Sequence, residues 1–283
     1  MLLSGPVPLV YCDHNFIVTA DQESEAYKDH LRQLATTGAA TFVLSPFHWV
    51  EMAEDLNPAR ADEKADFVDS LRARWLHERR NVQRKEVATA FFHFARIPSV
   101  APQMVADVTD VIADLAGQRG YRDSRAFVAH LRGIEPNHPL KHGLRKAFET
   151  NQANVISYRA GKLTPTILRD TERLYIQRLL PTNTPAGVVI DAETKKHFLD
   201  AYQLTDFPSF ALETRATQDN WATGRQLSRN NFLDQQHVMA LPYVDLFVTD
   251  DRPLTGLIAR IVAGVPFRCG RVVPRAQFDC LYP

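Results

Sequence analysis

Four acidic side chains lie beside expected strand ends or in the helices next to them: Asp13, Glu51, Asp234 and Asp251. Carboxylates gathered at one place repel one another, and they stay ionised together only when a cation neutralises them. Oxygen ligands without a nearby cysteine favour Mg²⁺ or Mn²⁺ over Zn²⁺. Such sites most often hydrolyse phosphodiester bonds. The four residues therefore predict a divalent-metal site, provided that the fold brings them together.

Short apolar runs indicate the strands that would position the first two acids. Residues 7–12 (VPLVYC) and 40–44 (ATFVL) are predicted to be buried strands. Asp13 directly follows the first. Ser45-Pro46 follows the second and is a strong helix start, with Ser as the N-cap and Pro at the first helical position. Glu51 lies in this helix, six positions after Ser45.

The other two acids flank a third strand, expected over 245–249. Asp234 lies near the start of a helix expected over 230–241, and Asp251 follows the strand. In α/β folds, ligands bind at the carboxyl ends of parallel strands. We therefore expect the four carboxylates to meet at one edge of a parallel sheet.

The pattern predicts an α/β fold with a three-layer α/β/α core and a central, mainly parallel sheet. A helix is expected over 59–80, and a last edge strand within 265–273. Residues 98–204 show amphipathic helical patterns separated by Gly and Pro. We predict a discontinuous core, residues 1–97 and 205–283, interrupted by a helical insertion over 98–204.

Four short segments resemble the sequence motifs of PIN-domain ribonucleases, in the order of that family: YCDHN (11–15), SPFHWVE (45–51), DQQHVMA (234–240) and VTDD (248–251). The resemblance covers roughly residues 7–95 and 205–273. It implies a PIN-like, metal-dependent endoribonuclease fold with the four carboxylates as catalytic and metal-binding groups. The chain differs from the common pattern in being about twice the usual length of the family.

Further residues acquire candidate roles from the same resemblance. Asn15, Ser45 and Thr249 would hold the metal ligands or a phosphate in place. Asp250 stands beside Asp251, so either residue could be the fourth ligand, and we favour Asp251 because it is the Asp of Thr-x-Asp. His237, one turn after Asp234, is a candidate phosphate contact or support for a ligand. Weaker candidates for substrate binding are Arg229, Arg79 and Arg80.

Composition narrows the protein class. Lys plus Arg and Asp plus Glu are both 33, so net charge gives no support to sequence-independent nucleic-acid binding. Three cysteines without close spacing argue against a disulfide framework. No signal peptide or membrane-spanning apolar run is recognised, and a cytoplasmic protein without a membrane partner is expected. GxSxG, P-loop, GxGxxG and HExxH patterns are absent, which removes the usual support for several other enzyme classes.

The expected function is hydrolysis of single-stranded RNA with Mg²⁺ or Mn²⁺, leaving 5′-phosphate and 3′-hydroxyl ends. The protein would then be a toxin with an antitoxin partner or a stand-alone defence nuclease, and a homo-oligomer is a further expectation. Two alternatives remain open. The fold could serve as a catalytically inactive RNA-binding or scaffolding module, or as a structure-specific DNA nuclease.

Overall fold

Six short strands form one sheet in the computed structural model, which describes residues 7–116, 120–134, 139–223 and 229–283. The strands are β1 (Leu9–Cys12), β2 (Thr41–Leu44), β3 (Arg74–Leu76), β4 (Val105–Ala106), β5 (Leu246–Val248) and β6 (Arg271–Val273). Their order is β4-β3-β2-β1-β5-β6. All neighbouring pairs are parallel except β3 and β4. The predicted α/β fold with a mainly parallel sheet is confirmed.

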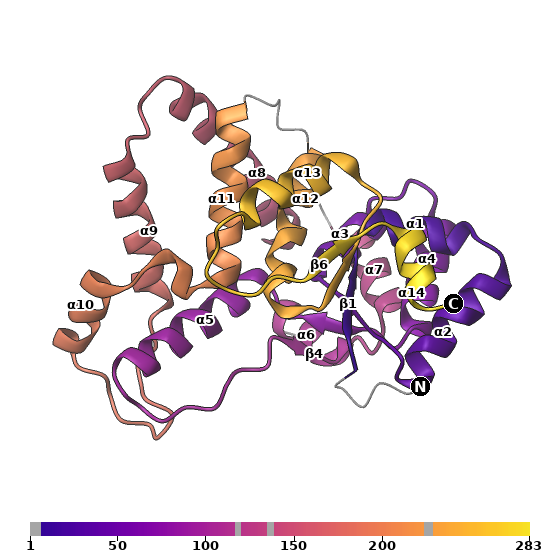
Figure 1. The fold of residues 1–283 in the computed structure, drawn as a ribbon, viewed down its shortest axis with the longest axis horizontal. Helices are drawn as coiled ribbons and strands as arrows, with labels where there is room; N and C mark the ends of the chain where they lie inside the picture. The colour runs from indigo at the N-terminus through magenta and orange to yellow at the C-terminus, as the bar shows by residue number, and fades with distance from the viewer. Residues whose placement is uncertain (1–6, 117–119, 135–138, 224–228) are drawn as a thin grey trace.

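Helices cover both faces of the sheet (Figure 1). Their bounds are α1 (His14–Gln22), α2 (Glu25–Thr37), α3 (Pro46–Ala53), α4 (Pro58–Ser70), α5 (Arg79–Phe94), α6 (Val108–Ala116), α7 (Ser124–Gly133), α8 (Pro139–Arg159), α9 (Pro165–Leu179), α10 (Ala192–Ala201), α11 (Pro208–Thr223), α12 (Arg229–His237), α13 (Arg252–Val262) and α14 (Arg275–Leu281). Two 3₁₀ helices, η1 (Leu204–Asp206) and η2 (Val238–Tyr243), precede α11 and follow α12.

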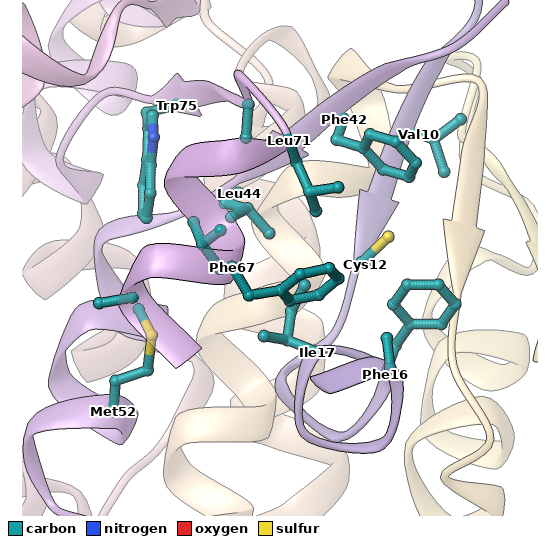
Figure 2. Close-up of a cluster of buried hydrophobic side chains, with 14 of the residues drawn as sticks. Val10, Cys12, Phe16, Ile17, Phe42, Leu44, Met52, Phe67, Leu71 and Trp75 are labelled. Atoms are coloured by element: carbon teal, nitrogen blue, oxygen red, sulfur yellow. The ribbon is translucent and has the colours of Figure 1, made fainter. Parts of the chain in front are cut away.

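The central strand β1 shows why the sequence forms three layers. Its side chains point alternately to the two faces of the sheet. Val10 and Cys12 pack in one buried cluster, with residues of α1, α3, α4 and α7 (Figure 2). Tyr11 packs in the opposite cluster, with residues of α11, η2 and α13. A continuous apolar run is what a strand buried on both faces requires.

The structure corrects the helix predicted over 59–80. α4 ends at Ser70, and Trp75 and Leu76 lie in β3. Arg72 takes a positive φ of 50°, which cannot continue a right-handed helix. Trp75 instead stacks on Trp49 of α3, with ring centroids 3.9 Å apart. Tertiary packing therefore overrides the helical spacing of the apolar residues.

Part of the predicted insertion, 98–204, packs on the core. β4 pairs with β3 through Trp75 and Ala106. Phe127 of α7 is buried in the same cluster as Val10, and α7 contacts both α3 and α4. Helices α9 and α10 instead share a separate buried cluster with α5 and the start of α11. The division into domains stays a prediction, but the sheet and its core extend beyond residue 98.

The last predicted strand, within 265–273, is shorter than expected because β6 begins only at Arg271. Gly270 precedes it and lies against Val244. A Cβ on Gly270 would lie 2.9 Å from the Val244 carbonyl oxygen, so the close approach requires glycine. The backbone N–H of Gly270 donates to the Leu241 carbonyl, 2.7 Å away. This contact fixes the chain before it enters the sheet.

Candidate acidic site

The ends of the central strands surround a cavity of about 250 Å³. Its lining residues come from four separate stretches of the chain: Asp13, His14, Asn15, Glu51, Glu54, Leu233, Asp234, His237 and Asp251. All four predicted carboxylates are among them. The fold thus brings together acids that are up to 238 positions apart, at the carboxyl edge of β1 and β5.

Asp13 is the most buried of the four acids, at 2% exposure. It is the N-cap of α1, and its Oδ1 accepts from the Phe16 N–H at 2.7 Å. Its Oδ2 accepts from the Thr249 hydroxyl at 2.5 Å. Burial and the nearby Glu51 charge raise the pKa of Asp13 to about 6, against the opposing effect of these hydrogen bonds. Asp13 is therefore held rigidly between the ends of β1 and β5.

Glu51, on α3, is paired with histidine. Its Oε2 lies 3.1 Å from Nε2 of His237 and 3.6 Å from Nδ1 of His14. Burial alone would raise the pKa of Glu51, but the charge and hydrogen bond of His237, with His14, lower it to about 2. Glu51 is therefore ionised at neutral pH, and its charge is largely compensated within the protein.

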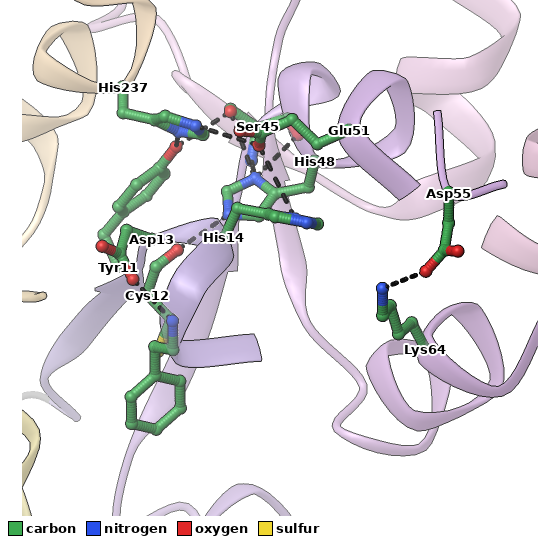
Figure 3. Close-up of polar contacts among 11 residues, drawn as sticks. Tyr11, Cys12, Asp13, His14, Ser45, His48, Glu51, Asp55, Lys64 and His237 are labelled. Atoms are coloured by element: carbon green, nitrogen blue, oxygen red, sulfur yellow. Dashed lines mark hydrogen bonds and ion pairs between the residues drawn. The ribbon is translucent and has the colours of Figure 1, made fainter. Parts of the chain in front are cut away.

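A chain of buried polar contacts extends from this pair into the core (Figure 3). The Tyr11 hydroxyl lies 2.5 Å from Nδ1 of His237 and donates to Oγ of Ser45 at 2.8 Å. An ionised carboxylate only accepts hydrogen bonds, so the Nε2 atom of His237 that faces Glu51 carries a proton. The other ring nitrogen, Nδ1, faces the Tyr11 hydroxyl.

The electrostatic surroundings of His237 favour its protonated form. Burial lowers its pKa, but the charge and hydrogen bond of Glu51, with the charges of Asp234 and Asp13, raise it above the ordinary value. The surrounding acids therefore favour a positive charge on His237, and such a charge offsets part of their mutual repulsion.

Asp234, on α12, has the opposite electrostatic balance. Burial, with the charges of Asp251, Glu51 and Asp13, raises the pKa of its carboxyl to about 7, against the opposing effect of His237. Near neutral pH this carboxyl is close to half-protonated. Of the four acids, Asp234 would therefore gain most from a bound cation.

Asp251 and Asp250 point to different places. Asp251 lines the cavity and is the N-cap of α13, where its Oδ1 accepts from the Leu254 N–H at 2.7 Å. Its own N–H donates to the Thr249 hydroxyl at 3.0 Å. Asp250 is exposed and outside the cavity, and it accepts from the Arg275 N–H at 2.9 Å. The geometry favours Asp251 over Asp250 as the fourth cavity acid.

The supporting residues are placed at different depths. Asn15 is exposed and lines the cavity. Thr249 is buried, and its hydroxyl hydrogen-bonds to both the Asp13 carboxylate and the Asp251 N–H. Ser45 is also buried, as the N-cap of α3, and it contacts the cavity only through Tyr11 and His237. Ser45 therefore supports the site from below, and a direct phosphate contact does not fit this position.

Arg79 and Arg80 do not line the cavity. Arg79, at the start of α5, pairs with Glu213 of α11 at 2.7 Å, and Arg80 beside it is exposed. The side chain of Arg229 lies outside the described part of the chain. No basic substrate-binding surface around the cavity follows from these residues.

Sequence reasoning missed three contributors. Tyr11 lies in β1 two positions before Asp13, whose backbone is still extended, so the two side chains are expected on the same face. His14 directly follows Asp13, and Glu54 lies one helical turn after Glu51. The spacing relative to the predicted acids was therefore a usable signal for all three. The link between Tyr11 and His237, 226 positions apart, had no such signal.

The donors suit a hard divalent cation in kind, but their arrangement is not a finished metal site. Carboxylates are the preferred ligands of Mg²⁺, and two of them have raised pKa values next to like charges. Among the described residues, however, no three His, Cys, Asp or Glu side chains are placed to share one ion. Glu51 is already paired with His237. An ion would fit only after carboxylates turn toward it.

Two further observations complete the description. Within the ranges that the structure describes, every helix is too short or too polar to cross a membrane. Comparison with known proteins gives no match among protein-family models, curated proteins or solved structures.

Proposed function

We propose that the protein is a Mg²⁺- or Mn²⁺-dependent nuclease, with single-stranded RNA as its substrate. The observation that carries this proposal is the convergence of Asp13, Glu51, Asp234 and Asp251 on one cavity at the carboxyl edge of a parallel sheet. The order of the motifs in the sequence also supports a PIN-like ribonuclease. The same resemblance motivates the proposals of a cytoplasmic toxin or defence role and an antitoxin partner.

Three of the acids are proposed to hold the cation: Asp13, Asp234 and Asp251. A divalent cation in this cavity would supply positive charge to a phosphodiester and would lower the pKa of water. Thr249 fixes two of the three ligands, because its hydroxyl donates to Asp13 and accepts from the N–H of Asp251. This bridge limits the reorganisation needed before binding.

Glu51 and His237 are proposed to tune the site. The His237 ring holds Glu51 in one orientation, and the neighbouring acids favour the cationic form of that ring. A fixed cation weakens the repulsion between the cavity and the phosphates of RNA. If Glu51 acts as a further ligand, it must first leave His237. The pair therefore controls how many carboxylates reach the metal.

A non-catalytic RNA-binding module is the second candidate. It is favoured by the pairing of Glu51 with His237 and by the lack of a ready three-ligand cluster among the described residues. The two candidates differ in one measurable property. A nuclease cleaves RNA and needs a divalent cation, whereas a binding module leaves RNA intact with or without it.

The test is cleavage of labelled single-stranded RNA, and of single-stranded and branched DNA, with Mg²⁺, Mn²⁺ or EDTA. Asp251→Asn should reduce RNA cleavage by at least ~100-fold, because even partners behind metal ligands typically cost 10- to 100-fold. Asp250→Asn is the matched control, since the neighbouring acid lies outside the cavity, and it should stay within about twofold.

Each outcome separates the candidates. Cleavage of DNA alone would establish the DNA-nuclease alternative. RNA that is bound but not cleaved in either metal would establish the binding module. Equal activity of Asp251→Asn and the wild type would refute the acidic cavity as the active site. Growth arrest on expression tests the toxin assignment. A toxin should arrest growth, and both the Asp251→Asn substitution and co-expression of a small protein from a neighbouring reading frame should relieve that arrest.

A further inference from the structure

A second cavity, of about 560 Å³, lies between α5, α10, η1 and the end of η2, and shares no lining residue with the acidic site. Helices α5 and α10 are at the lower left in Figure 1. The volume is within the range of small-molecule pockets. Four aromatic side chains contribute to the walls: Phe94, Phe198, Tyr202 and Tyr243. The cavity therefore has the size and the apolar surface of a ligand site.

The aromatic walls are held in place by contacts with one another. Phe94 meets Phe198 edge to face with ring centroids 5.5 Å apart, and Phe198 is 6.0 Å from Tyr202. Phe198 is buried, at 2% exposure, whereas Phe94 is 42% exposed at the mouth. Aromatic rings attract cations through their faces, and cages of such rings bind ammonium groups.

The charged groups of this cavity are mostly acidic. Glu86 and Asp206 line it together with His93. Within the described part of the chain, no Lys or Arg side chain contributes to the lining. Lys85, the residue before Glu86, instead donates to the Gln103 carbonyl at 2.7 Å. A ligand that complements this lining therefore carries a positive charge.

Glu86 is a fixed part of the cavity wall. Its carboxylate accepts from the N–H of Ser209 at 2.6 Å, from the Ser209 hydroxyl at 2.7 Å and from the Tyr243 hydroxyl. Ser209 is in the first turn of α11, where the helix dipole favours an anion. Burial raises the pKa of Glu86, and these hydrogen bonds oppose that effect.

We propose that this cavity binds an organic cation, an amine with an aromatic or branched alkyl body. The body packs among Phe94, Phe198 and Tyr202, and the ammonium group lies toward Glu86 and Asp206. The site is independent of nuclease activity, because its residues belong to a different part of the fold. It is nevertheless connected to the acidic cavity, since Tyr243 ends η2 and η2 directly follows His237.

The test uses methionine methyl signals in NMR. The chain has four methionines, and Met104 lines this cavity while Met52 and Met239 are buried elsewhere. With ¹³C-methyl methionine, titration with 2-phenylethylamine should shift the Met104 signal in a saturable way and leave Met52 unchanged. 2-Phenylethanol has the same carbon skeleton without the charge. It should bind roughly tenfold more weakly.

Two wall variants locate the charge recognition. Asp206→Asn and Phe94→Leu should each weaken amine binding several-fold. Asp200→Asn is the matched control, because this acid lies two residues before Tyr202, in the last turn of α10, but pairs with Arg173 at the surface. Binding by Asp200→Asn should equal that of the wild type.

Three results would overturn the proposal. They are equal affinity for the amine and the alcohol, no saturable shift of Met104 with either, and amine affinity unchanged by both wall variants. Each readout is independent of RNA cleavage. A protein that binds the amine but does not cleave RNA would support this proposal and contradict the proposed nuclease function. A protein that cleaves RNA but does not bind the amine would do the reverse.

Discussion

Removal of one oxygen atom, in Tyr11→Phe, tests the buried network behind the acidic cavity. Tyr11 is fully buried, and its hydroxyl contacts Ser45 and His237 without any solvent access. Phenylalanine keeps the ring and its stacking on Phe247, with centroids 5.0 Å apart. The substitution therefore removes two polar contacts and leaves the apolar packing of the ring in place.

The expected loss of unfolding free energy follows from the two contacts. A neutral hydrogen bond, here to Ser45, contributes about 1 kcal/mol, and one to a charged group, here His237, contributes about 2 kcal/mol. Both former partners would remain buried, so water cannot replace the hydroxyl easily. We expect Tyr11→Phe to lower the unfolding free energy by about 3 kcal/mol, measured by urea denaturation monitored by circular dichroism.

Tyr27→Phe is the matched control. The Tyr27 hydroxyl also donates one hydrogen bond, to Asp279 at 2.8 Å, but at a half-buried site. Although the partner is a carboxylate, water can replace the hydroxyl at this half-buried site, so its loss should cost only about 1 kcal/mol. A double-mutant cycle of Tyr11→Phe with Ser45→Ala should give a coupling of about 1 kcal/mol. If Tyr11→Phe costs no more than Tyr27→Phe, and the cycle shows no coupling, the network does not hold the site together.

Three further substitutions test other parts of the structure. Thr249→Val removes the hydroxyl that donates to buried Asp13, and it should lower the unfolding free energy by about 2 kcal/mol in urea denaturation; an unchanged midpoint contradicts the bridge. Trp75→Ala empties the stack on Trp49 and should cost about 3–5 kcal/mol by the same method; a loss below about 1 kcal/mol would be incompatible with that packing. Burial raises the folded-state pKa of Glu86, so folding favours the protonated form of this carboxyl. The unfolding free energy of the wild type, relative to that of Glu86→Gln, should therefore fall as the pH rises from about 4.5 through the raised pKa. Thermal unfolding of both proteins across that pH range measures this stability difference. A wild-type advantage that grows with pH would contradict the prediction.

The local features of the site were predictable from the sequence. Asp13 and Asp251 follow apolar runs that became β1 and β5, and Ser45-Pro46 begins α3 as expected. These predictions depend on short stretches of chain, where turn chemistry and strand burial leave clear patterns. Parallel strand ends then bring such residues to one edge without further information.

The contacts that tune the site could not be predicted in this way. The pairing of His237 with Glu51 depends on how α12 lies against α3, which is decided by packing between distant segments. β3 was hidden within a helical pattern because its burial against Trp49 is a tertiary effect. The short helices α1 and α14 also lack long apolar periodicity, so only their packed positions identify them.

The position of β1 in the centre of the sheet has a consequence for biosynthesis. This strand is made first, yet one of its two neighbours, β5, lies more than 230 residues later in the chain. On the ribosome, β1 can pair with β2 but not with β5 until residues 246–248 have emerged. Asp234 and Asp251 become available to the cavity at about the same stage. A nascent chain that stops before Asp251 therefore cannot assemble the acidic cavity.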